Sequence, residues 1–344
     1  MKRLMTVCAL TAAVMAGSEL TAQPLKVASY NILYSGEFLG TPKNWEARKD
    51  DVAWMLREID ADVCGLQEAG IEQVDWLRKK LPGREIWGEY RGEDRLSLSG
   101  SPIIYRVDRF EALERGTFWL SPTPDVPGSY AWGSAGPRIC CWMRLKDKTD
   151  AREFVFANMH ADHVSKESKL KSSELCVARL KEIAKGADII LVGDHNVTDW
   201  QAPAKAIAKH LKDAIFACEA EPEGPWRSLN DFKFREKEVG AAEVRKEPKN
   251  KRWHKDEKKR TGRRCDYIYV PQSAKVLSYT TLPDRRDGKS LYPSDHFPVI
   301  AEVELAAYFA HSSAGWDTVP TGSATVYEKH AVRNLDKIPA EFRK

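Results

Sequence analysis

Short apolar runs recur along this chain, and a polar residue closes or opens nearly every one of them. Such runs, rich in β-branched and aromatic residues, predict β-strands. Polar groups at one rim of a sheet can converge on a shared crevice while the strands hold them in place. The residues in these rim positions are Asn31, Glu68, His160, Asp194, Asp266, Asp295 and His296.

Amphipathic segments lie between the apolar runs. Helices are predicted, from the period of their apolar residues, for 45–59, 71–81, 166–185 and 203–211. Strands are predicted for 26–32, 61–66, 101–105, 116–120, 139–145, 153–159, 188–192, 267–270 and 297–303. The strands at 101–105 and 116–120 are expected to pair. Because helices alternate with strands but several strands follow one another through short loops, the pattern favours mixed sheets flanked by helices.

The N-terminal residues differ in composition from the rest of the 344-residue chain. Lys2 and Arg3 precede an apolar run, and small and polar residues follow it up to Gln23. This pattern is typical of a secretory signal peptide, and the run is shorter than the ~20 residues that span a bilayer. We therefore expect a signal peptide over 1–23 and a secreted or periplasmic protein whose mature chain has no transmembrane segment.

The remaining chain is expected to be a monomer with one α/β domain over 24–305 and a C-terminal extension over 306–344. Six cysteines follow the signal peptide, and none of their spacings matches a zinc motif. Oxidation is possible in an exported protein, but most of these cysteines lie in strand-like apolar runs, where free thiols are buried as small hydrophobic groups. Disulfides and buried thiols both remain open.

The rim residues have the chemistry that hydrolysis of a phosphate ester requires. Glu68, Asp194 and Asp295 offer hard oxygen ligands, which suit Mg²⁺ or Mn²⁺ and not zinc. His160 and His296 can transfer protons or stabilise charge in a transition state. A metal, a base that activates water and donors around the phosphate oxygens are what phosphoryl transfer needs.

Three further rim residues complete the set. Asp266 can hold His296 in one tautomer and stabilise its imidazolium form. The amides of Asn31 and Asn196 can contact a phosphate or a metal without adding negative charge. The set predicts a metal-dependent phosphoesterase.

The strings around these residues resemble motifs of the endonuclease/exonuclease/phosphatase superfamily, the DNase I-like proteins, and follow its order between about residues 25 and 305. The stretch 116–122, with Pro137-Arg138-Ile139 downstream, is similar to the secreted bacterial branch. The other matching strings are Ser29-Tyr30-Asn31-Ile32, Leu66-Gln67-Glu68, Asn158-Met159-His160-Ala161-Asp162-His163, Gly193-Asp194-His195-Asn196, Cys265-Asp266-Tyr267-Ile268 and Ser294-Asp295-His296-Phe297-Pro298.

The resemblance implies a four-layer α/β sandwich, in which two mixed β-sheets pack face to face with helices outside. It implies that Glu68 holds the catalytic Mg²⁺ or Mn²⁺, with Asn31 and Asp295 beside it. Asp194 would position the attacking water, and Asn196 would bind the phosphate.

The resemblance implies two alternative roles for each of two histidines. His296, paired with Asp266, would act as general base or stabilise the transition state. His160 would donate to a phosphate oxygen or to the leaving group. From the residues alone, Arg138 can clamp a phosphate or form a structural ion pair, and His163 can line the site or bond a loop.

The chain departs from the superfamily pattern at two places. His195 stands where an aromatic residue is usual, and strand alternation predicts that it faces away from the site. Relatives often carry an acidic residue just before the strand at 101–105, where this chain has Leu98-Ser99-Gly100.

A basic insertion over 231–264 precedes Asp266, with 14 Lys/Arg against 7 Asp/Glu. Its composition predicts an exposed, poorly packed segment. It would bind nucleic acid through phosphate neutralisation and stacking on Phe234 and Trp253, or it is a solvated loop.

The substrate class of the predicted enzyme remains open. A nuclease is favoured because of the basic insertion, and a phosphatase or a sphingomyelinase-like phosphodiesterase is the alternative. Membrane-active members expose an apolar hairpin, for which the sequence shows no clear candidate. A non-catalytic binding module would be expected to have lost a residue such as Glu68 or His296, and a zinc hydrolase would need a His/Cys ligand cluster.

Overall fold

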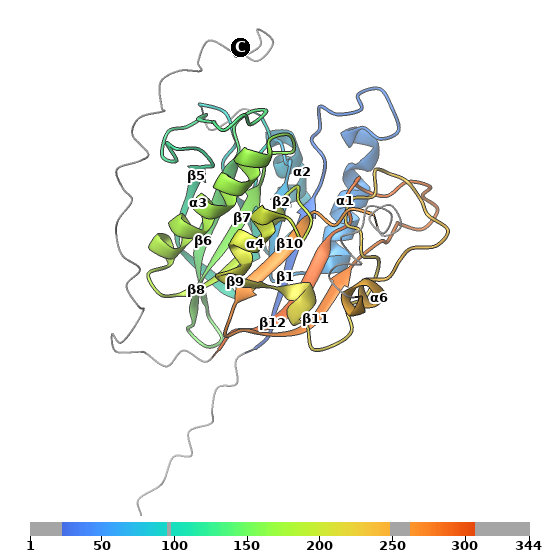
Figure 1. Ribbon diagram of the computed structural model, residues 1–344. Coiled ribbons are helices and arrows are strands. Elements are labelled where there is room, and N and C mark those ends of the chain that lie inside the picture. Colours follow the sequence, from blue (N-terminus) through green and yellow to red (C-terminus); the bar gives the residue numbers. More distant parts are fainter. Residues whose placement is uncertain (1–22, 95–97, 248–261, 307–344) are drawn as a thin grey trace, which may run out of the picture.

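The computed structural model describes residues 23–94, 98–247 and 262–306. Within these residues twelve strands form two mixed sheets of six strands each (Figure 1). The first sheet has the order β11 (Lys275–Thr281), β12 (Val299–Glu304), β1 (Leu25–Asn31), β2 (Val63–Gln67), β4 (Ile103–Arg106) and β3 (Arg84–Trp87). The second has the order β5 (Phe110–Trp119), β6 (Ile139–Asp147), β7 (Glu153–His160), β8 (Asp188–Asp194), β10 (Asp266–Pro271) and β9 (Leu211–Asp213).

Helices cover the outer face of each sheet (Figure 1). The first sheet packs against α1 (Trp45–Ile59) and α2 (Ile71–Lys80), and the second against α3 (Lys166–Ala184) and α4 (Ala202–Ala208). The short helices α5 (Ala214–Ala217) and α6 (Ala241–Lys246) add side chains to the core between the sheets. The predicted four-layer α/β sandwich is confirmed.

Alternation along β1 shows why its residues are apolar on both faces. Val27 lies in the core between the two sheets, whereas Ala28 and Tyr30 lie under the helices of the first sheet. All three side chains are fully buried. A strand with helices on one side and a second sheet on the other exposes neither face, so it lacks the polar alternation of a surface strand.

Strand direction brings the rim residues together. β1 runs parallel to β2, and β7 runs parallel to β8, so the carboxyl ends of these four strands meet at one rim. β10 and β12 run antiparallel to their neighbours, so their amino ends lie at the same rim. Asp194 is therefore in register with His160 on one side and with Asp266 on the other.

Some predicted elements are corrected by the tertiary structure. The expected pairing of 101–105 with 116–120 is wrong, because β4 pairs with β2 and β3 whereas β5 pairs with β6 in the other sheet. The helix expected over 203–211 ends at Ala208, and Leu211 begins β9. The strands β3, β9 and β11 were not predicted. Each lies at a sheet edge, where one side needs no hydrogen-bonded neighbour and the apolar signal is weak.

The described parts of the basic insertion are better packed than its composition predicts. Ala241 and Val244 of α6 are buried in the core. Arg264 is 1% exposed and makes two hydrogen bonds, of 2.8 and 2.6 Å, to the Asp213 carboxylate. Trp253 and most of the lysines lie in 248–261, outside the described residues. The expected signal peptide over 1–23, apart from Gln23, and the extension over 306–344, apart from Ala306, lie outside them as well.

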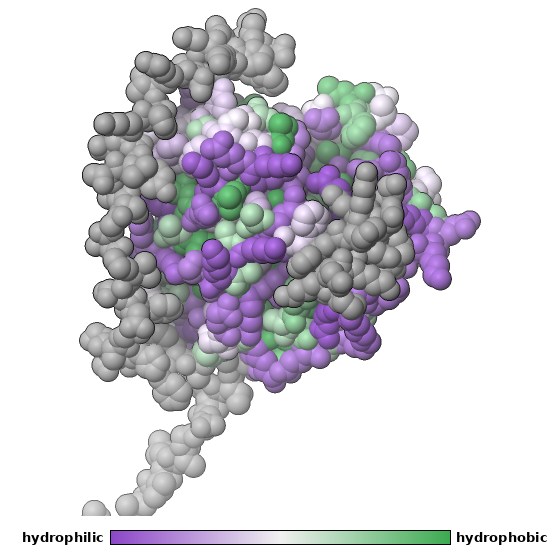
Figure 2. All heavy atoms as spheres, viewed as in Figure 1, coloured by the Kyte–Doolittle hydropathy of each residue, from purple (hydrophilic) through white to green (hydrophobic). Residues whose placement is uncertain are grey.

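The visible surface is mainly hydrophilic, with apolar side chains in scattered patches (Figure 2). One patch is the loop between β1 and α1, at the upper right of both views. Its Phe38 and Leu39 are 44% and 74% exposed, so this loop has an apolar tip that the sequence analysis did not identify. No helix of the described chain is long and apolar enough to cross a bilayer. The six cysteines of the described residues are buried free thiols.

Candidate active site

Asn31 joins the two sheets at the centre of the rim. Its Nδ2 donates to Glu68 Oε1 (3.1 Å) and to Asp194 Oδ2 (3.2 Å), while its Oδ1 accepts from the Leu33 amide (3.0 Å). The Leu33 amide is a donor, so it determines which end of the Asn31 amide faces the carboxylates. In this orientation Asn31 positions the two carboxylates. Acting as a metal ligand would require its amide to turn over and lose the bond from Leu33.

Glu68 follows β2 in a left-handed conformation, with φ of 61°. That conformation ends the strand and is uncommon for a residue with a side chain. The Tyr34 amide donates to Glu68 Oε2 (3.1 Å), so both carboxylate oxygens have a donor. Strained backbone of this kind persists where surrounding contacts determine it, as they do here.

His296 lies between two aspartates. Its Nδ1 is 2.8 Å from Asp266 Oδ2, and its Nε2 is 3.8 Å from Asp194 Oδ2. Burial lowers the pKa of His296, but the adjoining Asp266 and Cys265 together outweigh burial and raise that pKa well above its usual range. His296 is therefore an imidazolium at neutral pH, suited to stabilising negative charge.

In Asp194, by contrast, the surroundings disfavour the charged form of the side chain. Burial, followed by the charge of Asp266, raises the pKa of Asp194 to about 7. Its Oδ1 accepts from the Asn196 amide (2.9 Å), which leaves Oδ2 facing the site. A carboxylate that binds protons near neutral pH is suited to accept one from water.

His160 and Arg138 form the other wall of the site. Arg138 Nη1 lies 3.4 Å and Asn196 Nδ2 lies 3.3 Å from His160 Nε2, so two donors point at one ring nitrogen. Burial, followed by the charges of Arg138 and Arg91, lowers the pKa of His160 well below its usual range. His160 is therefore neutral and accepts hydrogen bonds at Nε2.

Arg138 contacts an acidic residue and a second histidine. Its Nη2 is 2.9 Å from Nδ1 of the exposed His163, at the edge of the site, and its Nε is 3.7 Å from Asp162 Oδ1. Asp162 also accepts bonds from the Ala135, Val164 and Ser165 amides, so it belongs to the loop structure. Arg138 is thus anchored by an acid while its outer nitrogens reach the site.

The donor set fits a divalent cation beside Glu68 and Asp295. Glu68 accepts from Asn31 Nδ2, and Ser294 Oγ lies 2.7 Å from the Asn31 carbonyl oxygen and 3.2 Å from Asp295 Oδ1, so both carboxylates stand beside Asn31. Burial raises the pKa of Asp295, and the negative charge of Glu68 raises it further. Two carboxylates in such surroundings favour a bound cation, and oxygen donors favour Mg²⁺, Mn²⁺ or Ca²⁺. Arg48 lies nearby but bonds to the backbone oxygens of Ile32 and Pro293.

A second group of potential ligands, Asp194, Cys265 and His296, has ligand atoms within 4.8 Å of one another. It fits a cation less well. His296 Nδ1 is already paired with Asp266, and burial raises the pKa of the Cys265 thiol to about 12, which disfavours the thiolate that binds metals.

Two positioning residues were not identified from the sequence. Arg48 of α1 is 2% exposed and donates to the Ile32 (3.0 Å) and Pro293 (2.6 Å) carbonyls, so it holds the loops that carry Asn31 and Asp295. Ser228 Oγ accepts from the amides of Cys265 (3.0 Å) and Asp266 (3.1 Å). No sequence signal marks either residue, because each acts on backbone groups remote along the chain.

Comparison with known proteins decides the family. The sequence profile of the endonuclease/exonuclease/phosphatase family matches residues 28–296. The chain belongs to this family. Its name covers endonucleases, exonucleases and phosphatases, all of which hydrolyse phosphate esters.

Two solved structures from Bacteroides thetaiotaomicron are similar to this family member over most of its length. A protein described by the same family name is 31% identical and covers 83% of this chain and 100% of its own, with a TM-score of 0.71. A mannosyl-6-phosphatase is 32% identical and covers 82% of this chain and 100% of its own, with a TM-score of 0.70. Among curated proteins, the 3'-5'-exoribonuclease subunit Ccr4 of the CCR4-Not complex from Mycosarcoma maydis is 27% identical over 168 residues, which are 42% of this chain. The match spans only 25% of that protein's length.

His195 of this family member faces away from the site. Its ring packs edge-on against Tyr267 and Tyr269, with centroids 5.3 Å away in each case. Among the described residues neither ring nitrogen has a hydrogen-bond partner, and burial lowers the pKa of His195 to about 3. The ring is therefore neutral in the folded chain across the physiological range.

Replacing His195 with phenylalanine is expected to reduce the acid sensitivity of the fold. Below the unfolded pKa of about 6.5 the unfolded chain binds a proton at His195 that the folded chain does not, so stability falls as pH falls. Between pH 7.5 and 5.0 this group should lower the free energy of unfolding by about 2 kcal/mol in the wild type and not at all in the variant. Urea unfolding at pH 7.5 and 5.0 measures the difference. The exposed His210, whose pKa is also lowered by partial burial and by neighbouring lysines, is the comparison, and His210→Gln should change the pH dependence much less because solvent screens this group. An unchanged dependence in His195→Phe would contradict the assignment.

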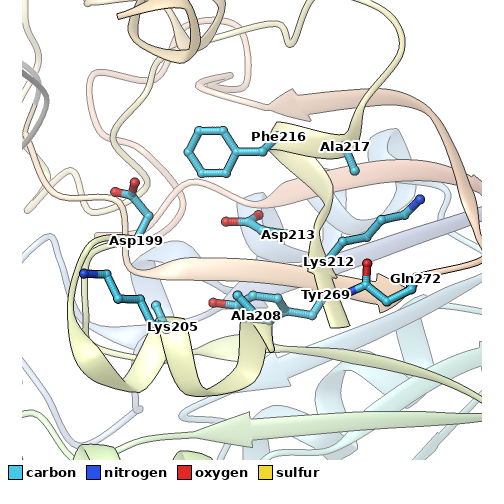
Figure 3. A pocket seen from close by; sticks show the side chains of 10 residues that line it. Asp199, Lys205, Ala208, Lys212, Asp213, Phe216, Ala217, Tyr269 and Gln272 are labelled. Carbon is cyan, nitrogen blue, oxygen red and sulfur yellow. The ribbon is translucent and has the colours of Figure 1, made fainter. Parts of the chain in front are cut away.

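A separate cavity of about 530 Å³ lies on the outer side of the second sheet, between α4, β9 and α5 (Figure 3). Its lining combines alanines with Lys205, Lys212, Asp213, Phe216 and Tyr269. No rim residue lines it, so it is distinct from the candidate active site.

Proposed function

We propose that this chain hydrolyses phosphate esters with the help of Mg²⁺ or Mn²⁺. The observation that carries the proposal is a continuous set of contacts across the two sheets. It runs from Glu68 through Asn31 to Asp194, and from Asp194 through His296 to Asp266. The set combines a carboxylate that titrates near neutrality with an imidazolium, beside a pair of carboxylates suited to a cation.

The residues divide the reaction between them. A divalent cation bound by Glu68 and Asp295 would neutralise charge on the phosphate oxygens. Asp194 accepts the proton of the attacking water, and His296 stabilises the negative charge of the transition state. That assignment favours the second of the two roles expected for His296, because its paired Asp266 keeps the ring protonated.

Arg138 and Asn196 supply donors to the phosphate. Their nitrogens lie 3.4 and 3.3 Å from His160 Nε2, so His160 keeps the two donors near one position. Donation by His160 itself would require the tautomer with hydrogen on Nε2.

A phosphate monoester of a small molecule is the substrate class with the broader support. The mannosyl-6-phosphatase resembles this chain over its full length, and the described residues place several cationic side chains beside one site. We further propose that the mature chain is exported, on the signal-peptide pattern of its first 23 residues.

A nuclease is the second candidate. The similarity to the exoribonuclease subunit supports it, as does a pair of cations on the side of the site next to the basic insertion. Burial, followed by the charge of Arg263, lowers the pKa of Lys169, and Asp194 acts on Lys169 in the opposite direction. Lys169, and Arg263 within the insertion, are therefore the side chains we propose for contact with a second phosphate of a longer substrate.

Removal of divalent cations is expected to abolish hydrolysis, and Mg²⁺ or Mn²⁺ should restore it. Glu68→Gln should lower kcat/KM by at least about 100-fold and raise the metal concentration needed, because it removes a charged ligand. The exposed Glu58→Gln on α1 is the matched control and should behave as wild type. The assay compares mannose 6-phosphate, DNA and RNA oligonucleotides, and sphingomyelin, with EDTA or added metal. Hydrolysis that persists in EDTA would refute metal dependence, and no hydrolysis of any ester would favour a binding module.

A further inference from the structure

A second arginine, Arg91, lies beside the site in the loop between β3 and β4. Its Nε donates to the Ser99 carbonyl (3.1 Å) and its Nη2 donates to Ser99 Oγ. Gly100, the next residue after Ser99, donates its amide to the Ala69 carbonyl (2.7 Å), and Ala69 directly follows Glu68. These bonds place the guanidinium near the metal-side carboxylate.

Arg91 and Arg138 are anchored by adjacent residues at the end of β5. Trp119 Nε1 donates to the Arg91 carbonyl (3.0 Å), and the Leu120 amide donates to the Arg138 carbonyl (2.7 Å). The carbonyls of Arg91 and Arg138 are thus held by consecutive residues, and the Arg138 guanidinium reaches the site, with Nη1 3.4 Å from His160 Nε2.

Among the described residues, neither guanidinium has a carboxylate within hydrogen-bonding distance. No carboxylate of the described residues lies within 4.0 Å of the Arg91 guanidinium, which bonds only to Ser99 there. The nearest carboxylate to Arg138 is Asp162 at 3.7 Å, and within the described chain the buried Nε of Arg138 has no hydrogen-bond partner. Arg138 itself is 6% exposed.

The electrostatics agree with this geometry. Burial, followed by the charge of Arg138, lowers the pKa of Arg91 to about 10, while Glu68 acts in the opposite direction. Two like charges in a poorly solvated wall repel each other and carry a desolvation cost. An anion that contacts both would offset the repulsion and the desolvation together.

We propose that Arg91 and Arg138 form a two-arginine clamp that recognises the dianionic phosphate of a monoester and thereby selects monoesters over diesters. A monoester carries two negative charges and three non-bridging oxygens near pH 8, whereas a diester carries one charge and two such oxygens. The clamp rests on the proposed phosphoesterase function and determines the substrate class of that site. Arg91 acts as a binding residue, and Ser99 keeps it available because a serine leaves its charge unneutralised.

The test compares kcat/KM for p-nitrophenyl phosphate and bis(p-nitrophenyl) phosphate at pH 8 with Mg²⁺. Arg91→Gln should lower kcat/KM for the monoester by about 10- to 100-fold and for the diester by less than about 3-fold. Ser99→Asp should shift the ratio in the same direction, because its carboxylate would neutralise Arg91 without removing it. Arg91→Lys, which keeps the charge, should fall between wild type and Arg91→Gln. Arg115→Gln, which removes an exposed arginine paired with Glu85, is the control and should change neither value.

Equal losses on the two esters in Arg91→Gln would overturn the clamp. Binding of inorganic phosphate, measured by calorimetry, separates the clamp from the proposed function. Should the wild type hydrolyse neither ester, the proposed function fails for these esters, and phosphate binding alone decides on the clamp. A dissociation constant at least about 10-fold weaker in Arg91→Gln supports it, and an unchanged constant refutes it.

Discussion

Replacing Asp266 with asparagine is expected to lower kcat by about 1000-fold while KM and the metal requirement change little. Asp266 is fully buried, and its Oδ2 lies 2.8 Å from His296 Nδ1. Asparagine preserves the shape but removes the charge that keeps His296 protonated. The ring would then be uncharged near neutral pH and would no longer stabilise the negative charge of the transition state.

The pH profile distinguishes this role from a structural one. Wild-type activity should fall on the acid side as Asp194 becomes protonated, with a pKa of about 7, and on the alkaline side as His296 deprotonates, well above pH 6.5. In Asp266→Asn the alkaline fall of the residual activity should move to lower pH. Cys265→Ala is the comparison: it removes a thiol that lies 3.6 Å from Asp266 Oδ2 and 3.9 Å from His296 Nδ1 but keeps both charges, so its loss of activity should be much smaller. A loss below about 10-fold in Asp266→Asn would refute the role of the pair. Loss of metal dependence in Cys265→Ala would instead favour a cation at Asp194, Cys265 and His296.

The second large effect concerns stability. Gly193→Ala is expected to destabilise the fold by at least about 3 kcal/mol. Gly193 precedes Asp194 in β8 and has φ of 149°, and a Cβ there would lie 1.9 Å from the carbonyl oxygen of Met159 on the paired strand β7. Backbone of a central strand cannot move aside without breaking the parallel pairing, so the substitution should also displace Asp194 and His160.

Gly186→Ala is the matched control for this experiment. Gly186 also has a positive φ, of 92°, but a Cβ there would meet nothing within 4 Å. Gly186→Ala should lower the free energy of unfolding by about 1 kcal/mol, from the backbone conformation alone. Urea unfolding of both variants measures the difference. Equal losses would show that the close approach of β7 and β8 is unimportant.

Local patterns along the chain were enough to predict most of the strands and helices. They also identified the residues that stand at the rim of the sheets. Six strands could be recognised as apolar runs, because packed layers bury both of their faces: β1, β2, β7, β8, β10 and β12. Asn31 and Asp194 each stand where such a run ends, so their positions followed from the ends of the strands. The helix over residues 45–59 was predicted with its observed bounds, because its apolar period is a local feature.

Strand pairing required the tertiary structure. β4 and β5 are joined by a short loop and read as a hairpin, yet they belong to different sheets. The edge strands β3, β9 and β11 receive part of their stability from partners far along the chain, which no local pattern reports. The same applies to Arg264, whose basic surroundings predicted exposure but whose pairing with Asp213 buries it.

The sequence by itself determined the family motifs, the layers and the chemical types at the site. Only the tertiary structure decided how those groups act. Asn31 and Asp194 are 163 residues apart, and their 3.2 Å contact orients the Asn31 amide. The protonation states of Asp194, His160 and His296 depend on burial and on neighbouring charges, and Arg91 gained significance only beside Arg138. Charge interactions and desolvation depend on distances in space, and the order of residues along a chain does not specify those distances.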